Sequence, residues 1–183
     1  MVVQHGLRLP AGFEITEVAD DKLAADIHCM TLDPLGRVVV SGRGYVRVLV
    51  DDNNDGKADR ALDFAAAPPD GAMGLFWEKN DLYCVGAGGL RVYREASGRG
   101  RERPSELLFR CRTGGEHLAH AVGRGPDGWL YLLGGDGTGI TAQHATLPTS
   151  PIKDPVGGCI LRFSPDGKGC EIVADGFRNA YAM

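Results

Sequence analysis

The chain has 183 residues, the length of one ordinary domain. It contains 27 glycines and 43% hydrophobic residues, which indicates a packed core built from short elements and tight turns. The formal net charge of −4 argues against a nucleic-acid partner, and no apolar run approaches the ~20 residues that a membrane-spanning helix needs.

The beginning of the chain carries few signals. Residues 1–8 are predicted to be an N-terminal tail, and they lack both the basic and the apolar region of a signal peptide. The alternation of apolar and polar residues over 13–18 predicts a strand, and residues 20–26 predict one short turn. No long helix is expected anywhere in the chain.

An internal repeat organises the remaining residues. Residues 29–42, 72–86 and 119–134 each place two apolar strands around a turn rich in Gly, Pro, Asn or Asp, and each segment ends at Gly. Four short strands that repeat every ~40–50 residues are typical of β-propeller blades. The third and fourth strands of the repeats are predicted at 45–50 and 60–64, 90–93 and 106–109, and 159–163 and 171–174.

The expected fold is therefore all-β, a β-propeller of four-stranded antiparallel blades with three blades complete. Residues 9–183 would form one partial propeller domain, in which residues 180–183 open a fourth blade. Because a propeller needs at least ~4 blades to close its ring, we expect the chain to be the N-terminal part of a longer protein. The strand at 13–18 would then complete the last blade.

An acidic turn at residues 51–59 lies between two strands of the first repeat and places oxygen donors at alternating positions. Calcium takes ~6–8 oxygen ligands from loops of this kind. The turn predicts a structural Ca²⁺ site, although Leu62 stands where an EF-hand has its bidentate Glu; the alternative is a solvated turn without an ion. The predicted ligands are Asp51, Asn53, Asp55, Lys57 (through its carbonyl) and Asp59.

Two histidines lie just before the first strand of the third repeat, in the run Gly115-Glu-His-Leu-Ala-His120. Histidine is the commonest general base near neutral pH, and connections between strands often carry function. His117 and His120 are therefore candidates for a catalytic site, while their spacing alone favours surface or hydrogen-bonded structural histidines.

Three other features have weaker signals. Arg178 and Asn179 offer a guanidinium and an amide that suit carboxylates and carbonyls, or they cap strand ends. The glycine-rich run 134–139 lacks the Lys-Ser/Thr pair and the helix of a phosphate loop, so we interpret it as an ordinary loop. Residues 140–156 predict a long insertion, and the five cysteines, which have no CxxC spacing, predict buried thiols.

Four runs occur together in an order that resembles a known group of proteins: Leu-Pro-Ala-Gly-Phe-Glu-Ile at 9–15, the acidic turn at 51–59, Glu-His-Leu-Ala-His-Ala-Val-Gly-Arg-Gly-Pro-Asp-Gly-Trp-Leu-Tyr at 116–131, and Gly-Phe-Arg-Asn at 176–179. The chain is similar to the glucose/sorbosone dehydrogenase-like propellers. It most resembles the planctomycete-type membrane-bound dehydrogenase domains.

The resemblance implies a six-bladed quinoprotein propeller, about half of it present here, that oxidises a sugar or alcohol hydroxyl with pyrroloquinoline quinone (PQQ). In that family pattern His117 would be the catalytic base, and Arg178, Asn179 and His120 would contact the cofactor. The sugar-oxidising relatives carry an Arg where this chain has Ala121. The resemblance also implies a periplasmic or extracytoplasmic location and a cytochrome c as electron acceptor of the full-length protein, with the chain alone inactive.

Two other classes of function stay open. The first is a non-catalytic propeller that binds carbohydrate or protein, because a propeller alone does not imply an enzyme. The second is a metal-dependent hydrolase of the gluconolactonase type, for which Glu14 and Glu17 are the early carboxylate candidates.

Overall fold

The computed structural model describes residues 2–4, 6–95 and 104–183. These residues form β-strands and one short 3-10 helix, η1 (Ala142–His144), and no helix among them has the length and apolar character of a membrane span. The strands are β1 (Val2–Gln4), β2 (Leu7–Leu9), β3 (Cys29–Leu32), β4 (Val38–Gly42), β5 (Tyr45–Val50), β6 (Arg60–Ala65), β7 (Gly74–Glu78), β8 (Asp81–Gly86), β9 (Gly89–Tyr93), β10 (Glu106–Arg110), β11 (Ala119–Arg124), β12 (Leu130–Gly134), β13 (Gly158–Phe163) and β14 (Cys170–Phe177).

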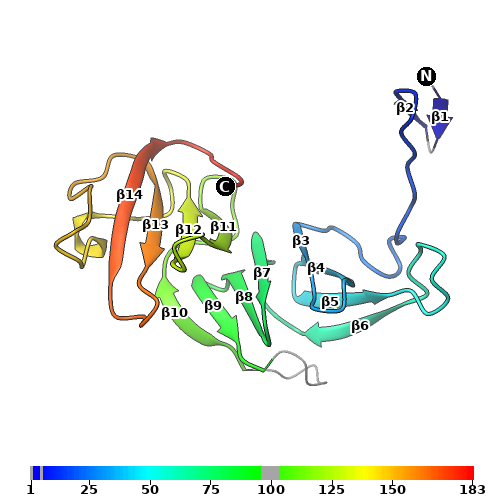
Figure 1. Cartoon of the computed structure of the whole chain (residues 1–183), viewed down its shortest axis with the longest axis horizontal. Coiled ribbons are helices and arrows are strands. Elements are labelled where there is room, and N and C mark those ends of the chain that lie inside the picture. The colour runs from blue at the N-terminus through cyan, green and yellow to red at the C-terminus, as the bar shows by residue number, and fades with distance from the viewer. Residues whose placement is uncertain (1, 5, 96–103) are drawn as a thin grey trace.

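Strands β3 to β14 form three four-stranded antiparallel sheets, each made of four consecutive strands (Figure 1). Sheet 1 contains β3–β6, sheet 2 contains β7–β10 and sheet 3 contains β11–β14. The all-β class and the three four-stranded sheets predicted from the repeat are thereby confirmed. The largest difference in bounds is β14, which continues to Phe177.

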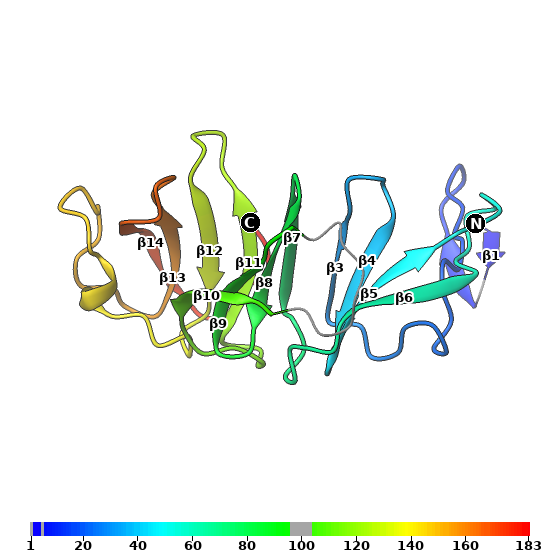
Figure 2. The ribbon, with the colours of Figure 1, turned by 90° about the horizontal axis from the view of Figure 1, so that it is seen from below.

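The first strands of the three sheets lie next to one another, with β7 between β3 and β11 in both views (Figures 1 and 2). Apolar side chains fill the space between neighbouring sheets. Between sheets 1 and 2, Phe64 packs edge-on against Trp77 and Tyr93, with ring centroids 5.6 and 5.5 Å away. Between sheets 2 and 3 the buried residues are Tyr83, Val85, Leu90, Val92, Ala119, Leu130 and Leu132.

Each second strand ends at a glycine because another part of the chain lies directly against it. A Cβ on Gly42 would come 2.6 Å from the carbonyl oxygen of Asp26, and one on Gly86 would come 2.5 Å from the Pro68 ring. These distances are shorter than real Cβ contacts, so only glycine fits. Because these glycines occupy the same position in their sheets, equivalent residues of different sheets can be identified by counting from them.

The outward face of sheet 1, which does not contact sheet 2, is partly covered by residues 19–24. Ala24, Val40 and Leu49 are buried there. The Arg47 side chain donates from Nη1 to the Leu23 carbonyl at 2.9 Å, and the Tyr45 hydroxyl donates to the Ala25 carbonyl at 2.6 Å. The predicted turn near residue 20 is confirmed and supports this cover.

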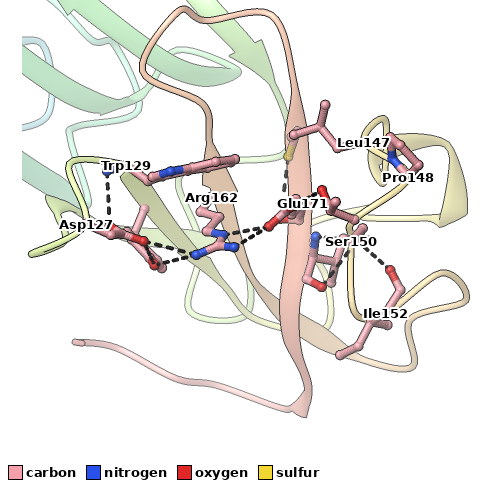
Figure 3. A network of polar contacts seen from close by, with 12 residues as sticks. Asp127, Trp129, Leu147, Pro148, Ser150, Ile152, Arg162 and Glu171 are labelled. Carbon is pink, nitrogen blue, oxygen red and sulfur yellow. Dashed lines mark hydrogen bonds and ion pairs between the residues drawn. The ribbon is translucent and has the colours of Figure 1, made fainter.

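Sheet 3 carries a polar network centred on Arg162 (Figure 3). The guanidinium donates from Nε to Glu171 Oε2 at 2.7 Å and from Nη1 to Asp127 Oδ2 at 3.0 Å, and it lies 4.5 Å from the centroid of the Trp129 ring. The buried Glu171 carboxylate also accepts a hydrogen bond from the Thr149 hydroxyl. Because Thr149 belongs to the insertion at 140–156, the network attaches that insertion to the sheet.

The insertion runs beside β14. The amide of Ile152 donates to the carbonyl of Ile172 at 3.2 Å, and the amide of Ile172 donates to Ser150 Oγ at 2.9 Å. Apart from η1, the insertion forms no regular element, as its sequence predicts.

The beginning of the chain differs from the prediction. Strands β1 and β2 pair with each other as a two-stranded ribbon, while residues 13–18 form no strand, so that prediction is wrong. A strand needs a partner for its backbone groups. The described residues pair this segment with no neighbouring strand; its backbone hydrogen bonds include those from the Phe13 amide to the Pro10 carbonyl at 3.3 Å and from the Ala58 amide to the Val18 carbonyl at 2.7 Å. Residues 178–183 also form no strand.

Candidate functional site

The structure pairs one of the predicted histidines with an acidic residue from another connection. His117 lies between β10 and β11, and Asp136 lies between β12 and β13. Their side chains meet with 2.7 Å between His117 Nδ1 and Asp136 Oδ1, and the two side chains are 33% and 42% exposed. The pair is thus held together yet accessible to a ligand.

The pairing decides which nitrogen of His117 is available. An ionised carboxylate can only accept hydrogen bonds, so Nδ1 must carry the hydrogen that is shared with Asp136. In the neutral ring this leaves the lone pair on Nε2. A carboxylate on Nδ1 also orients the ring and stabilises the cation that forms when Nε2 takes a proton, as in other histidine–carboxylate pairs.

The glycine-rich loop at 134–139 holds this pair in place. The amide of Gly137 donates to the His117 carbonyl at 2.8 Å, and the amide of Asp136 donates to the Arg178 carbonyl at 2.9 Å. A Cβ on Gly135 would lie 2.6 Å from the His117 oxygen and 2.7 Å from the Arg178 oxygen. The loop that we interpreted as ordinary therefore brings together His117, Asp136 and the end of β14.

Arg178 and Asn179 directly follow β14, and both are exposed. The Arg178 carbonyl accepts from the Asp136 amide, so the structure places the backbone of Arg178 against the loop that holds His117. Asn179 is the next residue along the chain. Sequence reasoning missed Asp136, which is 19 positions from His117. A signal was present, since an acidic residue flanked by glycines directly after a buried strand is suited to the edge of a site.

His120 has different surroundings. Its side chain is fully buried, its Nε2 lies 2.6 Å from the Glu116 carbonyl oxygen, and its ring is 4.2 Å from the ring of Tyr181. A direct contact between His120 and a cofactor, as predicted, would require Tyr181 to move.

The acidic turn at 51–59 lies between β5 and β6, at the end of the molecule away from β13 and β14 in Figure 1. Its side-chain oxygens accept hydrogen bonds from the turn itself. Asp51 Oδ2 accepts from the Gly56 amide at 2.8 Å, and Asp59 Oδ2 accepts from the Asp52 amide at 2.8 Å. Across the residues that the structure describes, no group of three or more His, Cys, Asp or Glu is placed to hold a metal ion, and the calcium site stays a prediction.

A cavity of about 370 Å³ also lies at that end and is lined by residues 17–20, 22–23 and 57–59. Glu17 is in its wall, but the carboxylates there do not gather into a metal site. The cysteines are free thiols. Burial raises the pKa of Cys29, Cys111 and Cys170 to about 12, so these thiols are protonated and unreactive near neutral pH.

Residues 3–183 match the family described as domain of unknown function DUF7133. The chain belongs to the DUF7133 family. The match covers all three sheets and the loops around His117, so the DUF7133 domain includes the whole candidate site. A search of curated proteins found no match for it.

Among solved structures, the DUF7133 chain is similar to the extracellular domain of a hybrid two component system from B. thetaiotaomicron, with 12% identity and a TM-score of 0.40. The similarity covers 87% of this chain and 23% of the other, so the DUF7133 chain spans about a quarter of that protein's length.

Proposed function

We propose that the three sheets of the DUF7133 chain are blades of a β-propeller. Each sheet is a meander of four consecutive strands, and the first strands lie side by side with apolar cores between neighbouring sheets. This arrangement is the one that radial repetition of blades requires. In a propeller the connections before β11 and after β12 would lie at one end of the blades, which is where His117 and Asp136 meet.

We further propose that the full-length protein oxidises a hydroxyl of a sugar or alcohol, with His117 as the general base. The observation that carries this proposal is the 2.7 Å contact between His117 Nδ1 and Asp136 Oδ1, which leaves Nε2 without a hydrogen bond to any described residue in a side chain that is 33% exposed. A base of this kind contributes about 10²–10⁴-fold to a proton-transfer step.

In the proposed reaction, the O–H and the neighbouring C–H bonds of the substrate break and a C=O bond forms. The proton moves to Nε2 of His117, and Asp136 stabilises the resulting imidazolium. The exposed guanidinium of Arg178 and the amide of Asn179 would bind the anionic or carbonyl groups that face them.

A quinone that carries carboxylates would suit this site, because Arg178, whose backbone carbonyl accepts from the Asp136 amide at 2.9 Å, adds a cation next to the loop that holds the base. A bound quinone of the PQQ type would supply the acceptor for the hydride lost by the substrate. In this proposal Arg178 and Asn179 hold that group, and the family resemblance further suggests an extracytoplasmic protein that passes electrons to a cytochrome c.

The test is turnover by the full-length protein, loaded with PQQ and supplied with sugars or alcohols and a redox dye. The His117→Ala variant should lose at least about 100-fold in rate. The Lys168→Ala variant, changed on the exposed turn between β13 and β14, should keep the wild-type rate. Equal rates for wild type and His117→Ala would remove His117 from the mechanism.

The same preparation distinguishes the non-catalytic alternative. A wild-type protein that binds carbohydrate with unchanged affinity after His117→Ala, and reduces no dye with any hydroxyl substrate, would be a binding propeller and would overturn the proposed oxidation.

A further inference from the structure

The short segment that carries His117 has every backbone carbonyl hydrogen-bonded. The carbonyls of Gly115, His117 and Leu118 accept from backbone amides, those of Leu118, Gly137 and Gly135 respectively. The carbonyl of Glu116, directly before His117, accepts instead from a side chain, the Nε2 of His120 at 2.6 Å. His120 is therefore the side chain that completes the anchoring of this segment.

The position of His120 is itself rigidly defined. The register of β11 against β12 shifts between Ala119 and Val122, so His120 lies in a β-bulge, a feature that re-aims side chains next to functional sites. On the other side, β7 approaches so closely that a Cβ on Gly74 would lie 2.0 Å from the His120 carbonyl oxygen. The ring is fully buried and covered by Tyr181.

The hydrogen-bonding state of the His120 ring follows from its partners. A carbonyl can only accept, so Nε2 must carry the hydrogen that is donated to Glu116. The second nitrogen, Nδ1, is buried and has no hydrogen-bond partner among residues 2–4, 6–95 and 104–183. An unsatisfied buried polar atom destabilises the fold, and a leucine or phenylalanine would avoid that loss. Unlike either apolar residue, the histidine provides the hydrogen bond that fixes the Glu116 carbonyl.

We propose that His120 is a positioning residue for His117. It fixes the Glu116 carbonyl and so sets the direction from which the His117 ring reaches Asp136. A catalytic consequence of this role rests on the proposed function, but the orientation of the His117 ring can be measured without turnover.

The experiment compares two replacements in the full chain by long-range ¹H–¹⁵N NMR of the histidine rings at neutral pH. His120→Gln keeps a donor nearly where Nε2 lies, whereas His120→Phe keeps a buried ring without a donor. Wild type and His120→Gln should show His117 with a protonated Nδ1 and an unprotonated Nε2. In His120→Phe the two nitrogen shifts of His117 should move toward each other, as expected for mixed tautomers.

Identical His117 shifts in all three proteins, or equal effects of both replacements, would overturn the proposal. If His120→Phe fails to fold, the wild-type protein alone gives a second test. Its His120 ring must show a protonated Nε2 and an unprotonated Nδ1, and the opposite tautomer contradicts the hydrogen bond to Glu116.

If the full-length protein turns over, His120→Phe should lower kcat about 10- to 100-fold, whereas His120→Gln should stay close to wild type. A protein without turnover that still gives the expected NMR result would refute the oxidation and leave the positioning role standing.

Discussion

Met30 and Leu75 occupy the same position of the repeat, yet only Leu75 is covered. Met30 on β3 pairs with Val40, and Leu75 on β7 pairs with Cys84; each partner lies two residues before the glycine that ends its strand. Leu75 packs against sheet 1 and is 8% exposed, whereas Met30 is 59% exposed. The face of β3 thus repeats the packing surface of β7 but has no sheet against it among the described residues.

This difference predicts unequal effects of two matched truncations. Leu75→Ala opens a cavity between two sheets and should lower the free energy of unfolding by about 2–5 kcal/mol. Met30→Ala removes an exposed side chain and should change it by no more than about 0.5 kcal/mol. Chemical denaturation of both variants measures this. A large loss for Met30→Ala would mean that another surface covers β3 in solution.

A second prediction concerns the loop that holds the histidine–carboxylate pair. Gly135→Ala forces a methyl group against two carbonyl oxygens, so the loop must shift and carry Asp136 away from His117. We expect a loss of about 1–3 kcal/mol in stability and a change in the His117 ring resonances. Gly123→Ala, in β11 with nothing within 4 Å of the added Cβ, is the control and should leave those resonances unchanged.

The cover over His120 can be tested with diethylpyrocarbonate, which modifies accessible imidazoles. In the wild type His117 should react and His120 should be protected, since His120 is fully buried beneath Tyr181. Tyr181→Ala should make His120 reactive in peptide mass mapping. Met183→Ala, which changes an exposed residue of the same segment, is the control and should leave His120 protected. If His120 is modified in Tyr181→Ala no faster than in the wild type, Tyr181 is not its cover.

The Arg162 network predicts how stability depends on pH. The hydrogen bond from Thr149, and then the Arg162 guanidinium, hold the pKa of Glu171 below its usual range. A carboxyl with a lowered pKa in the folded state stabilises that state fully above its unfolded pKa of about 4.3, and this stabilisation is lost as the pH falls from there through the lower folded pKa. Glu171→Gln should therefore be less stable than wild type at pH ~7, and the difference should shrink on acidification.

Denaturation of wild type and Glu171→Gln at several pH values between ~3 and ~7 measures this dependence. Asp154→Asn, which changes an exposed carboxyl on the insertion at 140–156, provides a control for general charge effects. A constant difference between wild type and Glu171→Gln across the range would contradict the role assigned to Thr149 and Arg162.

The strands were predictable because each has a local signature of apolar residues bounded by turn residues, and the repeat supports every strand with two equivalents. The strand predicted at 13–18 has the same alternation but joins none of the described sheets, because strand pairing is decided by the tertiary fold. The site shows the same difference between local sequence signals and contacts that depend on the tertiary fold. His117 and Arg178 stood out as residue types on connections, while the pairing of Asp136 with His117, 19 positions away, depends on the fold that places the two loops side by side.

The insertion at 140–156 has a consequence for association between molecules. Edge strands with unpaired backbone groups are templates for pairing with another chain. The outer edge of β14 is bonded to residues 150 and 152, so sheet 3 does not offer that edge to a neighbour. We therefore expect intermolecular strand addition to start at the outer strands of the other two sheets, β6 and β10. Lengthening these two strands should favour such addition, and charged substitutions in them should prevent it.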